Sequence, residues 1–480
     1  MNARLRCSLL LWCGAQASCA GATSQPAQRG PGTATTASPH TAPSSSARVQ
    51  APLAAAPQRD AAAEETVARA LKYISQLREL DALGPVKGRV ISRDEMVSRV
   101  EHDLDSEIPP AVVGASGEIL FALGTVPASF EYRHGLLEVM RSELLGFYEP
   151  HEKTMFLGAD LRGQELDATL WHELVHALQD QHYGLEKLLG WSDDAGDWQA
   201  AVHGLAEGDA TSAMIDALYA GRGMHAPDLP DSVMDLQSAL TTGSVQQVPA
   251  IIKRSVVAPY VDGLSFVNAL RRRGGWSAVA SAWRRLPAST EQLLHLDKYD
   301  AKELPEPIPA LASSVTGPKQ ATYSDIYGEE NLRVLFEEWM PARAAHDAAS
   351  GWAGDRITSF SDGPLTSVAW RIRYDNAGAA LNGLHAFARG ALATEDQAFD
   401  SRGRLSEFVS ATDAEHATQA GQVCRERHTR GPFAVLRHGR ELVVTLGPFR
   451  RTRGSSVSEG QCAIALGWAA ALLTLPKTAH

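Results

Sequence analysis

The sequence is poor in cysteine, in basic charge and in long apolar runs. Only five of its 480 residues are cysteine. So few thiols exclude a disulfide-framework miniprotein and a cysteine-rich zinc module. Lys and Arg number 45 against 56 Asp and Glu, which gives a net charge of −11. Nucleic acid is therefore not expected as a partner, because phosphate binding needs concentrated positive charge.

No segment is apolar over the length needed to span a bilayer. The closest, residues 462–475, is shorter than the roughly 20 residues that a membrane helix requires, and we expect a buried helix that ends at Pro476. Hydrophobic residues make up 44% of the chain and charged residues 21%, which is typical of an ordinary globular protein. The length allows a catalytic domain and an accessory domain.

The N-terminus predicts export. Two arginines precede an apolar stretch over residues 7–13, and small residues then lead to Cys19. This order is typical of a secretory signal peptide over residues 1–19. Cys19 after Ala-Ser also resembles the bacterial lipobox, although Gln16 fits that motif poorly. We therefore expect an exported protein: a cell-envelope lipoprotein tethered through Cys19, in the outer membrane or periplasm, or a secreted protein.

The folded part is expected to begin near residue 64. Residues 20–62 are dominated by Ala, Pro, Ser and Thr and predict a disordered linker, because they cannot bury enough apolar surface. Apolar residues at helical spacing predict a helix over residues 64–83. Ser92, followed three residues later by Glu95, predicts a helix N-terminus. Two strand-like runs around a Pro-containing turn predict a hairpin over residues 146–158.

The chemistry is concentrated in residues 165–182, which read ELDATLWHELVHALQDQH. Apolar residues fill one half of this predicted helix, and His172, Glu173 and His176 lie on the other half. They form an H-E-x-x-H motif. Residues four apart lie one turn apart on the same side of a helix, so two imidazoles can bind one zinc ion. Glu173 is then placed to deprotonate a water. The alternative is a pair of surface histidines on a solvated helix.

A zinc site needs a third protein ligand, and one candidate is His182. It lies six residues past His176, the spacing of the metzincin pattern HExxHxxGxxH. However, Gln179 stands where that pattern has glycine, and glutamine favours a continuing helix. A continuing helix would turn the His182 side chain about 80° away from His172.

The other candidate is Glu207, which lies in a second predicted helix between Gly204 and Gly208. Small residues let two helix backbones approach closely, so a short glutamate could reach a metal held by the neighbouring helix. The sequence favours Glu207 over His182. Asp180 and Asp209 fit better as carboxylates that orient the histidines than as ligands.

Together these motifs resemble the gluzincin class of zinc metallopeptidases, the peptidase-MA fold. The segments GFYEPHEKTMFLG, HELVHALQDQHYGL and AEGDA are similar to a poorly characterised group of exported bacterial HExxH proteins. The similarity covers roughly residues 64–300. It implies a zincin-like fold, zinc ligands at His172, His176 and Glu207, and a general base at Glu173.

The sequence departs from the class at one position. Thermolysin-like members carry an aspartate four residues after the third ligand, whereas this chain has Thr211 there and Asp209 two residues after Glu207. In the same class an edge strand before the zinc helix binds the substrate backbone. Residues 155–157 stand in that place, with an ordinary core hairpin as the alternative.

Peptide hydrolysis also needs a hydrogen-bond donor for the developing oxyanion. Two later residues could return to the site: Tyr260, in the segment VAPYVDGLSF, and His295, in STEQLLHLDKY. Either could act as this stabiliser, and both could instead be structural.

The C-terminal part predicts a smaller domain. We expect a helical connector over residues 311–351 and an α+β accessory domain over residues 352–480, with a hairpin over residues 433–446. Cys424 and Cys462 could pair in an exported chain, because disulfides persist in oxidising compartments. The sequence gives no distance between them.

The expected fold is α+β: a mostly helical zincin-like catalytic domain over residues 64–310 with a small sheet that presents an edge strand, plus the C-terminal α+β domain. The expected function is Zn²⁺-dependent hydrolysis of peptide bonds in the cell envelope, by a metallopeptidase acting on a peptide or protein. The alternative is a catalytically inactive, zinc-stabilised envelope lipoprotein that acts as a binding or scaffold module.

Overall fold

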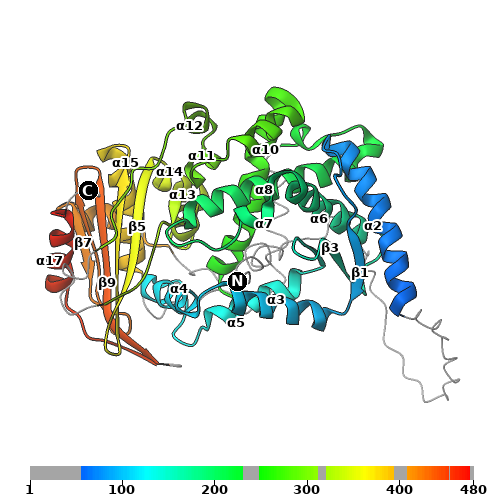
Figure 1. The fold of residues 1–480 in the computed structure, drawn as a ribbon. Helices are drawn as coiled ribbons and strands as arrows, with labels where there is room; N and C mark the ends of the chain where they lie inside the picture. The colour runs from blue at the N-terminus through cyan, green and yellow to red at the C-terminus, as the bar shows by residue number, and fades with distance from the viewer. Residues whose placement is uncertain (1–55, 231–247, 312–319, 394–407, 453–454, 476–480) are drawn as a thin grey trace, which may run out of the picture.

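The computed structural model describes residues 56–230, 248–311, 320–393, 408–452 and 455–475 (Figure 1). The expected signal peptide, Cys19 and most of the linker lie outside the described residues. The chain is α+β, with two sheets among many helices. In chain order the helices and strands are α2 (Ala56–Arg78), β1 (Lys87–Ile91), α3 (Arg93–Glu107), α4 (Pro110–Leu123), α5 (Tyr132–Glu143), β2 (Gly146–Glu149), β3 (Thr154–Gly158), α6 (Gly163–Tyr183), α7 (Leu185–Leu188), α8 (Gly196–Tyr219), α10 (Ala250–Arg284), α11 (Thr290–Leu294), α12 (Leu296–Ala301), β4 (Gln320–Asp325), α13 (Gly328–Phe336), α14 (Ala342–Ala349), β5 (Trp352–Asp362), β6 (Leu365–Tyr374), α15 (Ala377–Leu392), α16 (Ala411–Ala417), β7 (Gln422–Arg425), β8 (Phe433–His438), β9 (Glu441–Thr452), β10 (Ser455–Ser458) and α17 (Cys462–Leu473).

The first helix is displaced from its predicted bounds. α2 begins at Ala56, inside the segment expected as linker, and ends at Arg78, where Glu79 adopts a left-handed conformation with φ 54°. The predicted start of α3 is confirmed: the Ser92 side chain accepts a hydrogen bond from the Glu95 backbone N–H at 3.1 Å.

The small sheet has the strand order β1-β3-β2, so β3 is its central strand. β3 is parallel to β1 and antiparallel to β2, which confirms the predicted hairpin. Alternate β3 side chains enter two different cores, Phe156 on one face and Met155 and Leu157 on the other. The expectation that residues 155–157 form the edge was therefore wrong. The two edge strands are β1 and β2.

α8 is the central helix of the N-terminal half, residues 56–311 (Figure 1). Its side chains are buried from Asp197 through Ala217 with few exceptions, so it has no solvent face. It packs most extensively on α10 and also on α6. Because α8 is buried on all sides, each polar side chain on it needs a hydrogen-bond partner from a neighbouring element.

Three glycines let α8 and α10 touch along their backbones. A Cβ on Gly263 of α10 would fall on the carbonyl oxygen of Gly204, and one on Gly208 would meet the Gly263 carbonyl. The predicted close approach of helices at Gly204 and Gly208 is present, but its partner is α10. The contact with α6 that we expected from these glycines is made elsewhere on α8, where the Gln179 amide donates to the Ala206 carbonyl at 3.0 Å.

A buried ion pair joins the end of α2 to α8. The Arg78 guanidinium donates to both oxygens of Asp209, and both side chains are almost fully buried. The Trp283 indole N–H of α10 also donates to Asp209, at 2.8 Å. Three helices therefore share one carboxylate. Breaking a buried pair by removing one partner typically costs about 3–5 kcal/mol.

The C-terminal sheet is antiparallel and has seven strands, in the order β4-β5-β6-β9-β8-β7 with β10 on β9. Its first strand, β4, lies in the segment expected as a helical connector, where α13 and α14 also form. α15 packs on one face of the sheet and α17 on the other. Cys424 of β7 and Cys462 of α17 form a disulfide, which fastens α17 to the sheet edge.

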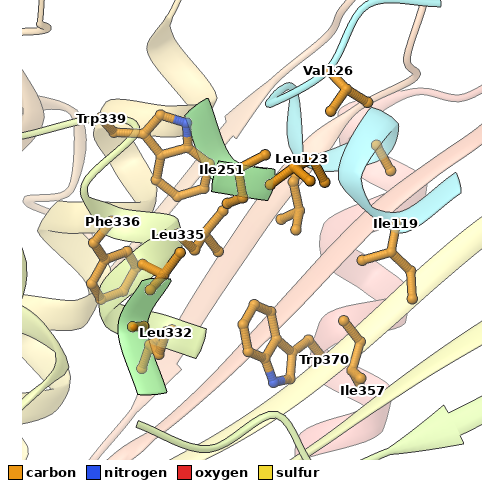
Figure 2. Packing of buried hydrophobic residues seen from close by; sticks show 14 of the residues in the cluster. Ile119, Leu123, Val126, Ile251, Leu332, Leu335, Phe336, Trp339, Ile357 and Trp370 are labelled. Atoms are coloured by element: carbon orange, nitrogen blue, oxygen red, sulfur yellow. The ribbon is translucent and has the colours of Figure 1, made fainter. Parts of the chain in front are cut away.

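The two halves share one hydrophobic core. Figure 2 shows Ile119 and Leu123 of α4 and Ile251 of α10 converging with Leu335 of α13 and Trp370 of the large sheet. The C-terminal end of α4 is also bound by arginines of the C-terminal half. Since the apolar contacts run continuously across the junction, the halves form one packed body rather than two units on a linker.

Two arginines satisfy the last carbonyls of α4. Arg427 donates to the Ala122 carbonyl at 2.6 Å, and Arg430 donates to the Phe121 carbonyl at 2.8 Å. Cations at a helix C-terminus also interact favourably with the helix dipole.

Among the described residues, no helix is both long and apolar enough to cross a membrane.

Because the backbones of α8 and α10 touch at Gly204, Gly208 and Gly263, one added methyl group at this crossing should strongly lower the stability of the fold. Gly263→Ala should lower the free energy of unfolding by about 3 kcal/mol, the upper end of the usual range for overpacking, because backbone cannot move aside as a side chain can. Urea denaturation followed by circular dichroism measures this change. The control is Gly114→Ala in α4, where an added Cβ meets nothing within 4 Å. Equal stabilities of the two variants would contradict the tight crossing.

Candidate metal centre

α6 and α8 bring together three ligand-type side chains. His172 and His176 lie one turn apart on α6, and their Nε2 atoms are 3.1 Å apart. Glu207 Oε2, from the middle of α8, lies 3.0 Å from His172 Nε2 and 3.5 Å from His176 Nε2. The exposed fractions of these residues are 2% for His172 and 0% for both His176 and Glu207. The three residues that the sequence singled out as ligands therefore meet at one buried point.

The triangle formed by these atoms fits a tetrahedral zinc ion. With ligands at about 2.05 Å from zinc, tetrahedral geometry separates two ligand atoms by about 3.3 Å. The three separations, 3.0, 3.1 and 3.5 Å, bracket that value. Two imidazoles and one carboxylate also leave a fourth coordination position, as catalytic zinc sites do.

Three histidines stabilise the charge of Glu207. Burial alone would raise the pKa of this carboxyl, but the three surrounding histidines hold its pKa well below the usual value. The third of them, His203, donates from Nε2 to Glu207 Oε1 at 3.0 Å. Burial lowers the pKa of His203 to about 4, so it is a neutral donor. Glu207 thus keeps Oε2 for the ligand triangle while Oε1 is held by His203.

Gln179 fixes the orientation of one ligand, a role that we expected of an aspartate. Its Oε1 lies 2.9 Å from His176 Nδ1, and its amide nitrogen donates to the backbone of α8. With Nδ1–H donated to Gln179, the Nε2 lone pair of His176 points to the triangle, an arrangement that is common behind metal-binding histidines. Gln179 lies three residues after His176 on the same face of the helix, and this spacing is the sequence feature from which the contact could have been predicted.

Asp180 and Asp209 do not contact the histidines as expected. Asp180 accepts from the Tyr148 hydroxyl at 3.2 Å and from the Glu186 backbone N–H. Asp209 is bound by Arg78 and Trp283, and Thr211 is buried nearby on the same helix. Both aspartates therefore brace the fold around the site.

Glu173 lies beside the triangle, on the side of the small sheet. Its Oε2 accepts a hydrogen bond from the Tyr148 backbone N–H at 3.0 Å, and its exposed fraction is 1%. Tyr148 belongs to the edge strand β2, and this N–H points away from β3. Burial raises the pKa of Glu173 against the lowering effect of the two ligand histidines. A carboxylate with a raised pKa is suited to accept a proton near neutral pH.

Of the two expected oxyanion donors, only Tyr260 lies at the centre. Its ring stacks on the His172 ring, with centroids 5.8 Å apart and an interplanar angle of 23°. His295 pairs instead with Glu329 at 2.8 Å, and its ring lies near that of His346. The structure thus places His295 in the contact between α11 and α13.

His182 also lies outside the triangle. α6 continues through Tyr183, and His182 Nε2 donates to the Asp81 carbonyl at 2.7 Å. The metzincin-like alternative therefore has no geometric support.

A second group of possible ligands, Glu291, Glu303 and Asp375, surrounds the Lys298 ammonium, which binds all three carboxylates. That group is an ion-pair network around a lysine.

Comparison with known proteins covers only the C-terminal half. A family model described as a domain of unknown function, DUF8575, matches residues 318–453. The matched segment runs from β4 to β9 and excludes every residue of the metal centre. No curated protein and no solved structure matches the chain.

The geometry predicts which substitutions remove the metal. The purified protein should hold one zinc ion per chain, and Glu207→Ala should lose it, because two histidines remain without a third ligand. His182→Ala should keep the metal, since its side chain binds a carbonyl remote from the triangle. Zinc per chain after dialysis, measured by mass spectrometry, decides this. Loss of zinc in His182→Ala with retention in Glu207→Ala would contradict the assignment.

Gln179 should act through His176 rather than by binding metal itself. Gln179→Leu is expected to weaken zinc affinity by about 10–100-fold, the usual effect of losing a partner behind a ligand. Competition with a zinc-binding dye measures the affinity. Gln164→Leu, at an exposed position of the same helix, is the matched control and should leave it unchanged. Equal affinities of the two variants would refute the orienting role.

Proposed function

We propose that this protein is a zinc-dependent peptidase of the gluzincin type, acting on peptide or protein substrates in the cell envelope. The observation that carries the proposal is Glu173, a buried carboxylate beside the His172, His176 and Glu207 triangle. A structural zinc site needs ligands but no base. A base fixed beside the ligands is what hydrolysis requires.

The roles of the residues follow from their positions. A zinc ion held by the triangle would polarise the scissile carbonyl and acidify a water. Glu173 takes a proton from the attacking water and delivers it to the leaving nitrogen. Tyr260, stacked on His172, is our candidate for the residue that donates a hydrogen bond to the developing oxyanion. The Tyr148 N–H keeps Glu173 in place.

The edge strand β2 is the expected guide for the substrate backbone. β2 has a partner only on its β3 side among the described strands. An extended peptide can add to such an edge through main-chain hydrogen bonds. The Tyr148 N–H of this edge is already bound to Glu173, so a peptide laid along β2 would pair through other backbone groups of the strand and pass beside the base.

Two features support export to an oxidising compartment. The first is the signal-peptide pattern over residues 1–19, with Cys19 as the site of a lipid tether. The second is the Cys424–Cys462 disulfide, a bond that is rare in reducing compartments. We therefore place the proposed activity in the cell envelope or outside the cell.

The second candidate is a zinc-stabilised scaffold without catalysis. It is favoured by the complete burial of His176 and Glu207, because structural zinc sites are closed. The two candidates differ in what Glu173 does: in a scaffold its replacement has no effect beyond the local hydrogen bond to Tyr148.

The deciding experiment compares wild type with Glu173→Gln on a peptide pool read by mass spectrometry. Both proteins should hold one zinc ion, and the variant should cleave at least about 100-fold more slowly, because general-base catalysis contributes at least that factor. Asp167→Asn, an exposed acid-to-amide change on the same helix, is the control and should cleave like wild type. If zinc-loaded wild type cleaves no faster than Glu173→Gln, the scaffold is the correct function.

A further inference from the structure

A cavity of about 300 Å³ lies between α4, α8, α10 and β4, apart from the metal centre. Among the described residues, its lining includes no member of the ligand triangle and neither Glu173 nor Tyr260. Pockets that bind small molecules commonly measure about 300–1,000 Å³. The cavity therefore has the size of a separate site for a small ligand.

Four aromatic rings reach this cavity from separate segments of the chain. Tyr132 belongs to α5, Trp191 to the loop before α8, Tyr323 to β4 and Tyr327 to the turn before α13. All four residues are half-buried, so solvent still reaches part of each. The faces of aromatic rings attract organic cations, and tryptophan attracts them most strongly. The rings therefore favour a cationic ligand.

The charged groups of the lining are acidic. Asp325 and Glu330 line the cavity with exposed fractions of 4% and 3%, and no Lys or Arg occurs among the described lining residues. The Asp325 carboxylate accepts hydrogen bonds from the Gly196 and Ile326 backbone N–H groups. It also accepts from the Tyr323 hydroxyl at 3.0 Å. Asp325 thus contributes charge to the cavity while its hydrogen bonds are made within the protein.

Glu330 differs from Asp325 because one of its oxygens lacks a donor. Its Oε1 is buried and has no hydrogen-bond partner within the part of the chain that the structure describes. A buried acceptor without a donor costs free energy. Since Glu330 lines the cavity, a donor placed there by a ligand would satisfy this oxygen.

The other polar side chains of the lining use donors inside the protein. Ser116 and Ser255 each donate to the backbone carbonyl four residues earlier, at 2.9 and 2.8 Å. The side-chain amides of Gln199 and Asn331 also donate to backbone carbonyls. These contacts leave amide oxygens and hydroxyl lone pairs to accept hydrogen bonds. A ligand that matches this lining must therefore be a donor.

The surroundings of Glu330 are also predominantly negative. Burial and the neighbouring Asp262 charge raise the pKa of Glu330, against the lowering effect of Arg333. Arg333 is itself paired with Asp262 and Glu337. The positive charge nearest to Glu330 is thus shared among several carboxylates, and a cation in the cavity would reduce their mutual repulsion.

We propose that this cavity is a second ligand site, which binds a small organic amine as its ammonium ion, with an N–H group on Glu330 Oε1 and the apolar body among the four rings. An ammonium supplies the donors and the positive charge that the lining lacks. The site requires neither the metal nor peptide cleavage. Tyr323, Tyr327 and Glu330 lie in the segment matched as a domain of unknown function, so this ligand would give that domain a role.

The test uses three probes of similar shape: phenethylamine, phenethyl alcohol and hydrocinnamate, which are a cation, a neutral molecule and an anion at neutral pH. Calorimetric titration of the full chain should give the amine a Kd at least about 10-fold below that of the alcohol, because hydrogen bonds to charged groups and cation–π contacts add to its binding. Hydrocinnamate should not bind. Equal Kd values for amine and alcohol, a preference for hydrocinnamate, or no binding of the amine at millimolar concentration would overturn the proposal.

Two variants place the amine in this cavity. Glu330→Gln removes the carboxyl group with little change in shape and should raise the Kd of the amine about 10-fold, while the Kd of the alcohol stays within about 2-fold. Trp191→Leu removes a ring at a half-exposed position and should raise the Kd of the amine about 5-fold.

Glu415→Gln is the matched control, because it makes the same change at an exposed position of α16 outside the lining, and it should bind the amine like wild type. Far-UV circular dichroism identifies the variants that fold. An amine Kd that either folded variant, Glu330→Gln or Trp191→Leu, leaves at the wild-type value would show that the amine binds elsewhere and would remove the basis for the site.

Discussion

The carboxylate of Glu207 is the constraint around which this molecule is arranged. It carries a charge on α8, a helix buried on every side, and an isolated charge there would cost many kcal/mol. Three imidazoles surround it in place of water. Two of them come from α6, so the charge also dictates which helix lies beside α8 and in which register. In the proposed enzyme, a zinc ion bound by these groups would add a further positive charge beside Glu207.

α8 holds its position through both backbone and side-chain contacts. The glycine crossing with α10 sets its depth, and the Arg78–Asp209 pair secures the turn that follows Glu207. Its first turn is bound by a residue from outside the N-terminal half, since the Gly196 N–H donates to Asp325 of β4. The C-terminal half therefore touches the helix that carries the third ligand. A ligand held to a few tenths of an ångström needs such supports, because small displacements change metal affinity strongly.

The sequence predicted what depends on neighbours along the chain, and failed where distant segments decide. The H-E-x-x-H helix, the β2–β3 hairpin and the Ser92 cap all follow from spacing within a few residues. Glu207 was singled out for its flanking glycines and does meet the histidines of α6, but the close backbone contact of those glycines is with α10. Strand order does not follow from such spacing: β1 pairs in parallel with β3 across intervening helices, which makes β3 the central strand and leaves β1 and β2 as the edges. Likewise nothing local to His295 shows that Glu329 binds it.

The arginines on the end of α4 bear on the order in which the chain can fold. Arg427 is 305 positions from its partner Ala122, and Arg451 is 334 positions from Gly117. During synthesis α4 is made long before the C-terminal strands. Until those strands are made, its apolar face is uncovered and its last carbonyls lack their arginine partners. Contacts of such long range are slow to form and leave intermediates prone to aggregation. Truncation before β9 should therefore destabilise the N-terminal half as well. The matched domain expressed alone would lack α4, which packs against it.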